Sequence, residues 1–175
     1  MQKLDTKSKI TLYLLILASF IWLGNTFSRM LFSYHIFADP ELNLKSFLNP
    51  EVLNGVFLIH QPLIAVSLIF YVVMIILFLS FIIISKQKLK ENGWLFISLI
   101  LVIITLPFEV YLLTYDFKFF YMLYFPKIDV SEAMKIVLMR YSTLGSFMIV
   151  ELLSYSAIIC LFLFQPLTKK IVNET

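Results

Sequence analysis

Four ionisable side chains lie within long apolar runs of this sequence: Arg29, His60, Glu109 and Glu151. A carboxyl or imidazole group can bind and release a proton, and a guanidinium group pairs with carboxylates. Ionisable groups are costly to place in the hydrocarbon of a membrane, so they are candidate functional sites there. Their types favour proton binding, ion pairing or transport as the chemistry of this chain.

The apolar runs themselves indicate a membrane protein. Of 175 residues, 61% are hydrophobic and 14% are charged, and the mean hydropathy is +0.92. Soluble domains contain about 45–50% apolar and about 25% charged residues. A helix crosses a bilayer with about 20 apolar residues, and four segments reach that length, at residues 10–37, 56–85, 93–117 and 141–164. We therefore expect residues 1–175 to form one transmembrane domain, an all-α, integral membrane, antiparallel four-transmembrane-helix bundle.

Two connections carry helix-start signals. Asn49 precedes Pro50 and Glu51, the order of an N-cap, a proline at the first helical position and an acid in the first turn. Asp129 precedes Glu132 at the spacing of a capping box. The second helix is therefore expected to begin near Pro50. The last helix is expected to begin near Asp129 and to continue without a break into the fourth span, and the aromatic run 117–125 is expected to lie in or on the outer interface.

The lysines predict the orientation of the spans. Basic residues favour the cytoplasmic side, and with four spans both termini and the loop between spans two and three share one side. That side carries Lys3, Lys7, Lys9, Lys86, Lys88, Lys90, Lys169 and Lys170. Both termini are therefore expected in the cytoplasm. The expected location is the bacterial inner (plasma) membrane, with an organellar inner membrane as the alternative.

The four ionisable residues are expected at a shared depth. With a rise of about 1.5 Å per residue, Arg29 and Glu109 come late in outward-running spans, and His60 and Glu151 come early in inward-running ones. All four then fall in the outer half of the bilayer or near its middle. Residues three, four or seven positions apart share a helix face, which places Asn25 with Arg29, Ser67 and Tyr71 with His60, Thr105 and Asp116 with Glu109, and Ser154 with Glu151.

Each polar face should turn toward the bundle interior or toward a partner protein, because lipid excludes charge. Three interpretations follow for this cluster. Arg29 forms an internal ion pair with one of the glutamates, or the cluster docks another membrane subunit, or it carries protons, ions or a substrate. For Arg140, near the outer end of its span, we expect the side chain to extend to the outer interface.

No cofactor and no metal site are predicted from the residue types. The only two imidazoles, His35 and His60, would have to meet at one depth to ligate a haem iron. Cys160 is the only cysteine, so no thiol metal site is expected. The net charge of +3 is too small to indicate nucleic-acid binding.

The sequence contains no recognisable set of catalytic residues, so an enzyme is not expected. The leading hypothesis is a non-catalytic subunit or assembly component of a larger inner-membrane complex, with the lipid bilayer and other membrane subunits as partners and no nucleic acid. The alternative is a small transporter or proton-conducting protein that uses Glu109 and Glu151. A haem-binding electron-transfer subunit is the third hypothesis.

Overall fold

The computed structural model describes residues 5–124 and 129–168, which form five α-helices joined by short connections. The helices are α1 (Thr6–Ile36), α2 (Pro50–Ser85), α3 (Gly93–Tyr124), α4 (Val130–Leu144) and α5 (Phe147–Phe164). All except α4 are long and apolar enough to span a membrane. Many apolar side chains on their outer faces are exposed, such as Ile59 and Ile83. These are the features of a multi-pass membrane protein.

The two helix starts that the sequence predicts are confirmed. Asn49 caps α2, with its side-chain oxygen accepting a hydrogen bond from the Val52 backbone N–H at 2.9 Å. Asp129 caps α4 and accepts from the backbone N–H groups of Ser131 and Glu132 at 2.9 and 3.2 Å. Both caps are local hydrogen-bond arrangements, so adjacent residues are enough to specify them.

The expectation of one continuous last helix is wrong. α4 ends at Leu144 and α5 begins at Phe147, with a turn at Gly145 and Ser146. Before the break, Thr143 donates its hydroxyl to the Met139 carbonyl oxygen at 2.7 Å. Such bonds compete with the helical backbone and bend helices, and glycine weakens the helix further. Only α5 therefore has spanning length in this region, and α4 is a separate short helix.

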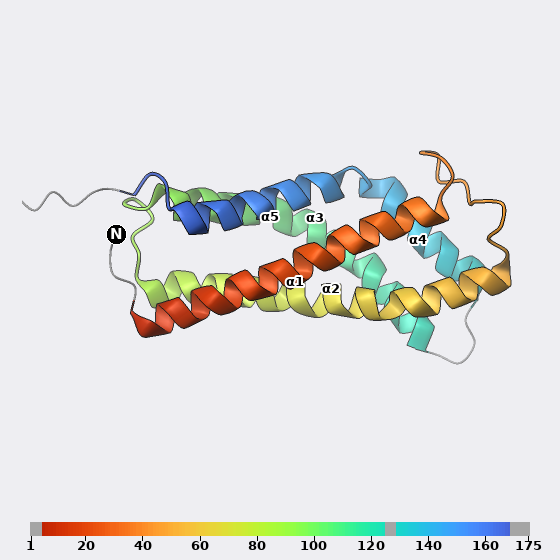
Figure 1. Ribbon diagram of the computed structural model, residues 1–175, viewed down its shortest axis with the longest axis horizontal. Coiled ribbons are helices and arrows are strands. Elements are labelled where there is room, and N and C mark those ends of the chain that lie inside the picture. Colours follow the sequence, from red (N-terminus) through yellow and green to blue (C-terminus); the bar gives the residue numbers. More distant parts are fainter. Residues whose placement is uncertain (1–4, 125–128, 169–175) are drawn as a thin grey trace, which may run out of the picture.

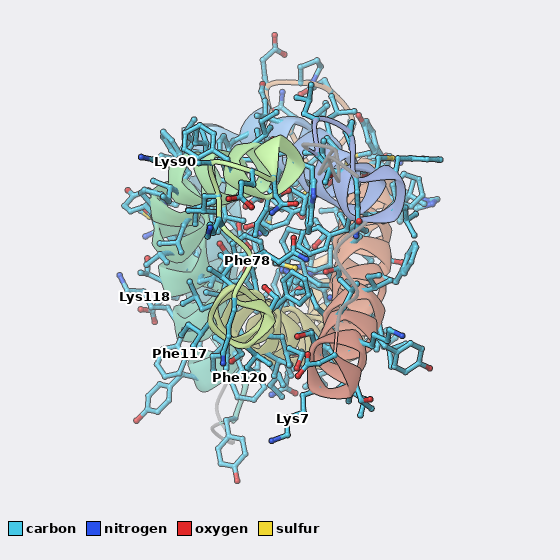
Figure 2. The ribbon with its side chains drawn as sticks, turned by 90° about the vertical axis from the view of Figure 1, so that its left-hand side faces the viewer. Lys7, Phe78, Lys90, Phe117, Lys118 and Phe120 are labelled. Carbon is cyan, nitrogen blue, oxygen red and sulfur yellow. The ribbon has the colours of Figure 1, made fainter. Side chains whose placement is uncertain are left out.

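The aromatic run belongs largely to α3, which continues to Tyr124, whereas Phe125 lies outside the described residues. The extended helix has two different faces. Phe119 and Leu123 are buried, while Phe117 and Tyr121 are exposed. Figure 2 shows Phe117 and Lys118 on the outer side of the helix. One face of this segment thus packs inside the protein, and only the other is available to an interface.

The helices run lengthwise beside one another (Figure 1). At one end, here called the terminal end, α1 begins, α5 ends and the connection between α2 and α3 turns. The Gly93 N–H donates to the Leu167 carbonyl there at 3.2 Å. At the opposite end, the far end, lie the connection between α1 and α2 and the whole of α4. α1 packs along α2, and α3 packs against α2, α4 and α5.

The interior contains two apolar cores separated by a polar layer. The terminal-end core is aromatic, and Phe78 points into it in Figure 2; it includes Phe78, Phe81, Trp94, Leu95 and Phe162. The far-end core includes Phe57, Phe119, Leu123, Ala133 and Met134. Between them lie the buried polar side chains that make up the candidate site.

Loss of the α4 cap should destabilise the far end. In Asp129→Ala two backbone N–H groups lose their acceptor, and we expect the free energy of unfolding to fall by about 1 kcal/mol. Asp129→Asn keeps an acceptor oxygen and should stay close to wild type. Thermal unfolding of the two variants in the same detergent measures the difference. Equal losses in both variants would show that the cap hydrogen bonds do not stabilise α4.

Candidate functional site

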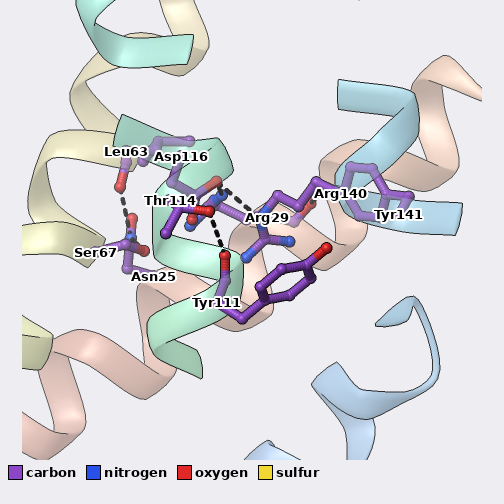
Figure 3. Close-up of polar contacts among 9 residues, drawn as sticks. All are labelled: Asn25, Arg29, Leu63, Ser67, Tyr111, Thr114, Asp116, Arg140 and Tyr141. Atoms are coloured by element: carbon purple, nitrogen blue, oxygen red, sulfur yellow. Dashed lines mark hydrogen bonds and ion pairs between the residues drawn. The ribbon is translucent and has the colours of Figure 1, made fainter. Parts of the chain in front are cut away.

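The centre of the polar layer is Asp116, whose Oδ1 atom contacts two arginines from two other helices. Arg29 on α1 donates from Nη2 at 2.5 Å, and Nε of Arg140 on α4 lies 2.7 Å from the same oxygen in an ion pair. All three residues are buried, with exposed fractions of 2% for Arg29 and Asp116 and 7% for Arg140. Figure 3 shows both guanidinium groups converging on Asp116. One carboxylate thus joins α1, α3 and α4.

This arrangement corrects two expectations. The structure pairs Arg29 with Asp116, about two helical turns from Glu109 on α3, and not with a glutamate. Arg140 does not extend to the outer interface, because it is buried and paired with the same carboxylate. Sequence analysis placed Asp116 on the correct face of its helix but not in the site. The feature of the sequence that could have identified Asp116 is its spacing of seven residues from Glu109, which places both carboxylates on one face of α3.

Glu109 and Glu151 form a second pair between α3 and α5. Each residue is 2% exposed, and their carboxyl groups lie close enough together to interact electrostatically. A hydrogen bond between these two carboxyl groups would require a proton on one of them, because a carboxylate has only acceptor atoms. The charges of Arg140 and Asp116 both interact with the two glutamates. The two glutamates are therefore next to the Arg29–Asp116–Arg140 cluster and are electrostatically coupled to it.

A hydroxyl network continues from the glutamate pair toward the terminal end. Tyr155 is one turn from Glu151 on α5, and its hydroxyl oxygen lies 3.2 Å from that of Tyr71. The hydroxyl of Thr105, one turn from Glu109 on α3, donates to Tyr155 at 3.3 Å. The indole ring of Trp22 packs on both tyrosines, with ring centroids 5.4 and 4.9 Å apart. All three rings also belong to the terminal-end core, which continues beyond them.

Of the remaining supporting residues, Asn25 and Ser67 form a buried contact between helices, whereas Ser154 does not. The Asn25 amide donates to the Leu63 carbonyl oxygen at 2.7 Å and to the Ser67 hydroxyl at 2.6 Å, which ties α1 to α2. Ser154 is only half-buried, and its neighbour Tyr155 is the α5 residue that enters the network. The predicted polar faces of α1 and α2 thus meet each other inside the protein.

His60 lines a small cavity beside the charged cluster. Its imidazole stacks on Phe32, with ring centroids 4.1 Å apart and planes 8° apart. The cavity is also lined by Arg29, Asp116 and Arg140 and holds about 20 Å³, enough for a water molecule, which needs about 10–15 Å³. Three buried polar atoms of these residues have neither a hydrogen-bond nor an ion-pair partner within the described part of the chain: Arg29 Nε, His60 Nδ1 and Asp116 Oδ2. A water donating to Asp116 and accepting from Arg29 fits this site.

The two histidines are not brought together. His60 is buried against Phe32, whereas His35 is exposed near the end of α1. No group of three or more histidine, cysteine or carboxylate side chains within residues 5–124 and 129–168 is arranged to hold a metal ion. The geometry therefore gives the haem hypothesis no pair of facing imidazoles in these ranges.

The chain matches no known protein-family model, and no curated protein or solved structure matches it significantly. The arguments for function therefore come from the geometry of the polar layer.

Removal of the central carboxylate should be more destabilising than removal of either arginine. Asp116→Asn leaves two buried guanidinium groups facing each other, and we expect a loss of about 3–5 kcal/mol in the free energy of unfolding. Arg29→Gln and Arg140→Gln each leave one complete ion pair and should lose less. Unfolding in detergent measures the order of the three.

The matched control for this series is Glu91→Gln, which breaks the exposed pair of Lys88 and Glu91. Exposed pairs contribute about 0–1 kcal/mol, so this variant should resemble wild type. If Asp116→Asn were as stable as the control, Asp116 would not hold the arginines in the way described.

Proposed function

We propose that this protein is a small proton-conducting or proton-coupled transporter of the inner membrane, with Glu109 and Glu151 as its proton-binding pair. In this proposal its four long helices form an antiparallel transmembrane bundle with both termini in the cytoplasm. The lysines at the terminal end support that orientation. The observation that carries the functional proposal is a pair of neighbouring carboxyl groups buried next to an excess of positive charge.

Charge balance explains why this pair would exchange protons. Arg29 and Arg140 against Asp116 leave one excess positive charge in a medium that disfavours net charge. One negative charge on the glutamate pair cancels it, and this is the state with a single proton shared between the two carboxyls. Like charges in contact disfavour loss of that proton, while the excess positive charge disfavours gain of a second. The pair thus has a defined resting state and two nearby charged states.

The groups on either side of the pair fit a proton path. The hydroxyls of Thr105, Tyr155 and Tyr71 lie on the terminal side. The water-sized cavity with His60 lies on the far side. The terminal-end core beyond the tyrosines is largely apolar, and its buried serines, Ser19 and Ser98, donate to carbonyl oxygens of their own helices. Within the described residues, no hydrogen bond between side chains extends the hydroxyl network in that direction. This favours a gated carrier over an open channel.

The subunit hypothesis remains the second prediction. It is motivated by polar residues in excess of what one bundle needs. Arg29, Glu109 and Glu151 are buried within this chain, so they are not surface groups that a partner would contact directly. Mass analysis of the proteins that co-migrate after extraction in mild detergent tests this hypothesis, and a clean, partner-free species would count against it.

Proton flux into liposomes tests the transport proposal. We expect Glu109→Gln and Glu151→Gln each to reduce the flux by about tenfold or more, because the variant pair can no longer exchange its proton normally. Glu91→Gln, in the exposed loop between α2 and α3, should conduct as wild type. Equal flux in wild type and in both buried variants would remove the proposal.

A further inference from the structure

The far end of the protein carries a second, larger cavity, here called the outer pocket. It holds about 740 Å³ and lies between the end of α1, the connection that follows it and the junction of α4 and α5. Its lining includes Ser33, Phe37, Asp39, Tyr141 and Ser146. This volume is in the range of small-molecule pockets, about 300–1,000 Å³. The outer pocket is thus large enough to hold many water molecules.

Tyr141 is the one residue that lines both the outer pocket and the cavity beside His60, within the described part of the chain. It is half-buried in the last turn of α4. On the inner side it adjoins Arg29, His60, Asp116 and Arg140. Tyr141 therefore lies between the outer pocket and the cavity that contains the charged cluster.

The contacts that hold this ring are weak. It packs edge-on against Phe37 with centroids 5.8 Å apart, and the guanidinium carbon of Arg140 lies 5.6 Å from its centroid. Its hydroxyl reaches the Arg29 carbonyl oxygen only at 3.5 Å, the outer limit of a hydrogen bond. An edge-on aromatic pair contributes about 0.5–1.5 kcal/mol beyond its buried area. Beyond its packing against the far-end core, the ring is thus held by individually weak contacts.

The backbone near Tyr141 also permits movement. The turn at Gly145 and Ser146 interrupts the helix one turn further along the chain, and Ser146 makes no side-chain cap for α5. A small rotation of the end of α4 would therefore displace the tyrosine ring without unwinding a continuous membrane-spanning helix.

The charge of the outer pocket suits proton delivery. Asp39 and Glu41 line it, and hydrogen bonds from the side chain and backbone of Asn43 lower the pKa of Asp39 below its usual value. Asp39 is therefore ionised at neutral pH. A concave site lined by carboxylates raises the local concentration of protons and other cations.

We propose that the outer pocket is the aqueous entrance to the polar layer and that Tyr141 is its barrier, controlling the access of water and protons to the cavity beside His60. The functional meaning of this barrier rests on the proposed transport function. Its structural content, a water-accessible route closed by one aromatic ring, is tested independently of transport.

Thiol labelling provides that test, because Cys160 is the only native cysteine. In a Cys160→Ser background, His60→Cys places a thiol in the cavity. Purified protein in nanodiscs, which expose both faces, is then treated with a small, charged methanethiosulfonate. We expect slow labelling when Tyr141 is present and labelling about tenfold or more faster with Tyr141→Ala, because thiol reactivity depends on access. Tyr141→Phe keeps the ring and should remain slow.

Two further positions serve as controls in the same background. Ser142→Cys lies in the outer pocket and should label rapidly whichever residue is at position 141. Ile59→Cys lies next to His60 in sequence but is 72% exposed on the lipid-facing side of α2, and it should label slowly throughout. Size-exclusion profiles that match wild type confirm that each variant is folded.

Equal labelling rates at position 60 with tyrosine, phenylalanine and alanine at position 141 would overturn the inference, whether the common rate is slow or fast. Faster labelling in Tyr141→Phe than in wild type would also overturn it, because the ring would then not be the barrier. Proton flux is measured separately. A lack of effect of Glu109→Gln and Glu151→Gln on flux, together with the expected labelling pattern, would remove the transport function and leave the barrier in place.

Discussion

One carboxylate oxygen that contacts two guanidinium groups is the interaction on which the interior of this protein depends. Asp116 joins helices α1, α3 and α4 through Arg29 and Arg140. A single buried charge would be strongly unfavourable, so each arginine is tolerated at this depth only because the carboxylate is there. The short helix α4 lies across the far end, and its buried Arg140 links it to the long helices beside it. Two apolar cores lie on either side of this contact, and a water-sized cavity adjoins it.

The unequal numbers of charges in that cluster give the glutamate pair its significance. Because two arginines meet one aspartate, electrical neutrality of the polar layer depends on the protonation of Glu109 and Glu151. A change in the position of α4 would alter the distance from Arg140 to the pair and so its preferred number of protons. Tyr141 adjoins Arg140 in the same helix. Water access and charge balance would therefore change together, which is the coupling that a gated carrier needs.

The sequence was sufficient for features that depend on neighbouring residues and insufficient for those that depend on packing. The four apolar segments follow from composition, and the starts of α2 and α4 follow from Asn49 and Asp129 within a single turn. The partner of Arg29 could not be derived in this way. It depends on how α4 crosses α3, and that crossing follows from the turn at Gly145 and Ser146. Thr143 and Gly145 favour a break there, but Gly145 and Ser146 keep helical backbone angles, so the sequence alone did not require one.

Infrared spectroscopy of the protein in lipid tests the central claim most directly, because the C=O stretch of a protonated carboxylic acid is distinct from the bands of a carboxylate. The account predicts that wild type at neutral pH has such a band from a buried acid and that Glu109→Gln and Glu151→Gln each alter it, whereas Asp39→Asn at the exposed far end leaves it unchanged. Absence of the band in wild type would mean that both glutamates are ionised. The neutral polar layer described here would then be contradicted.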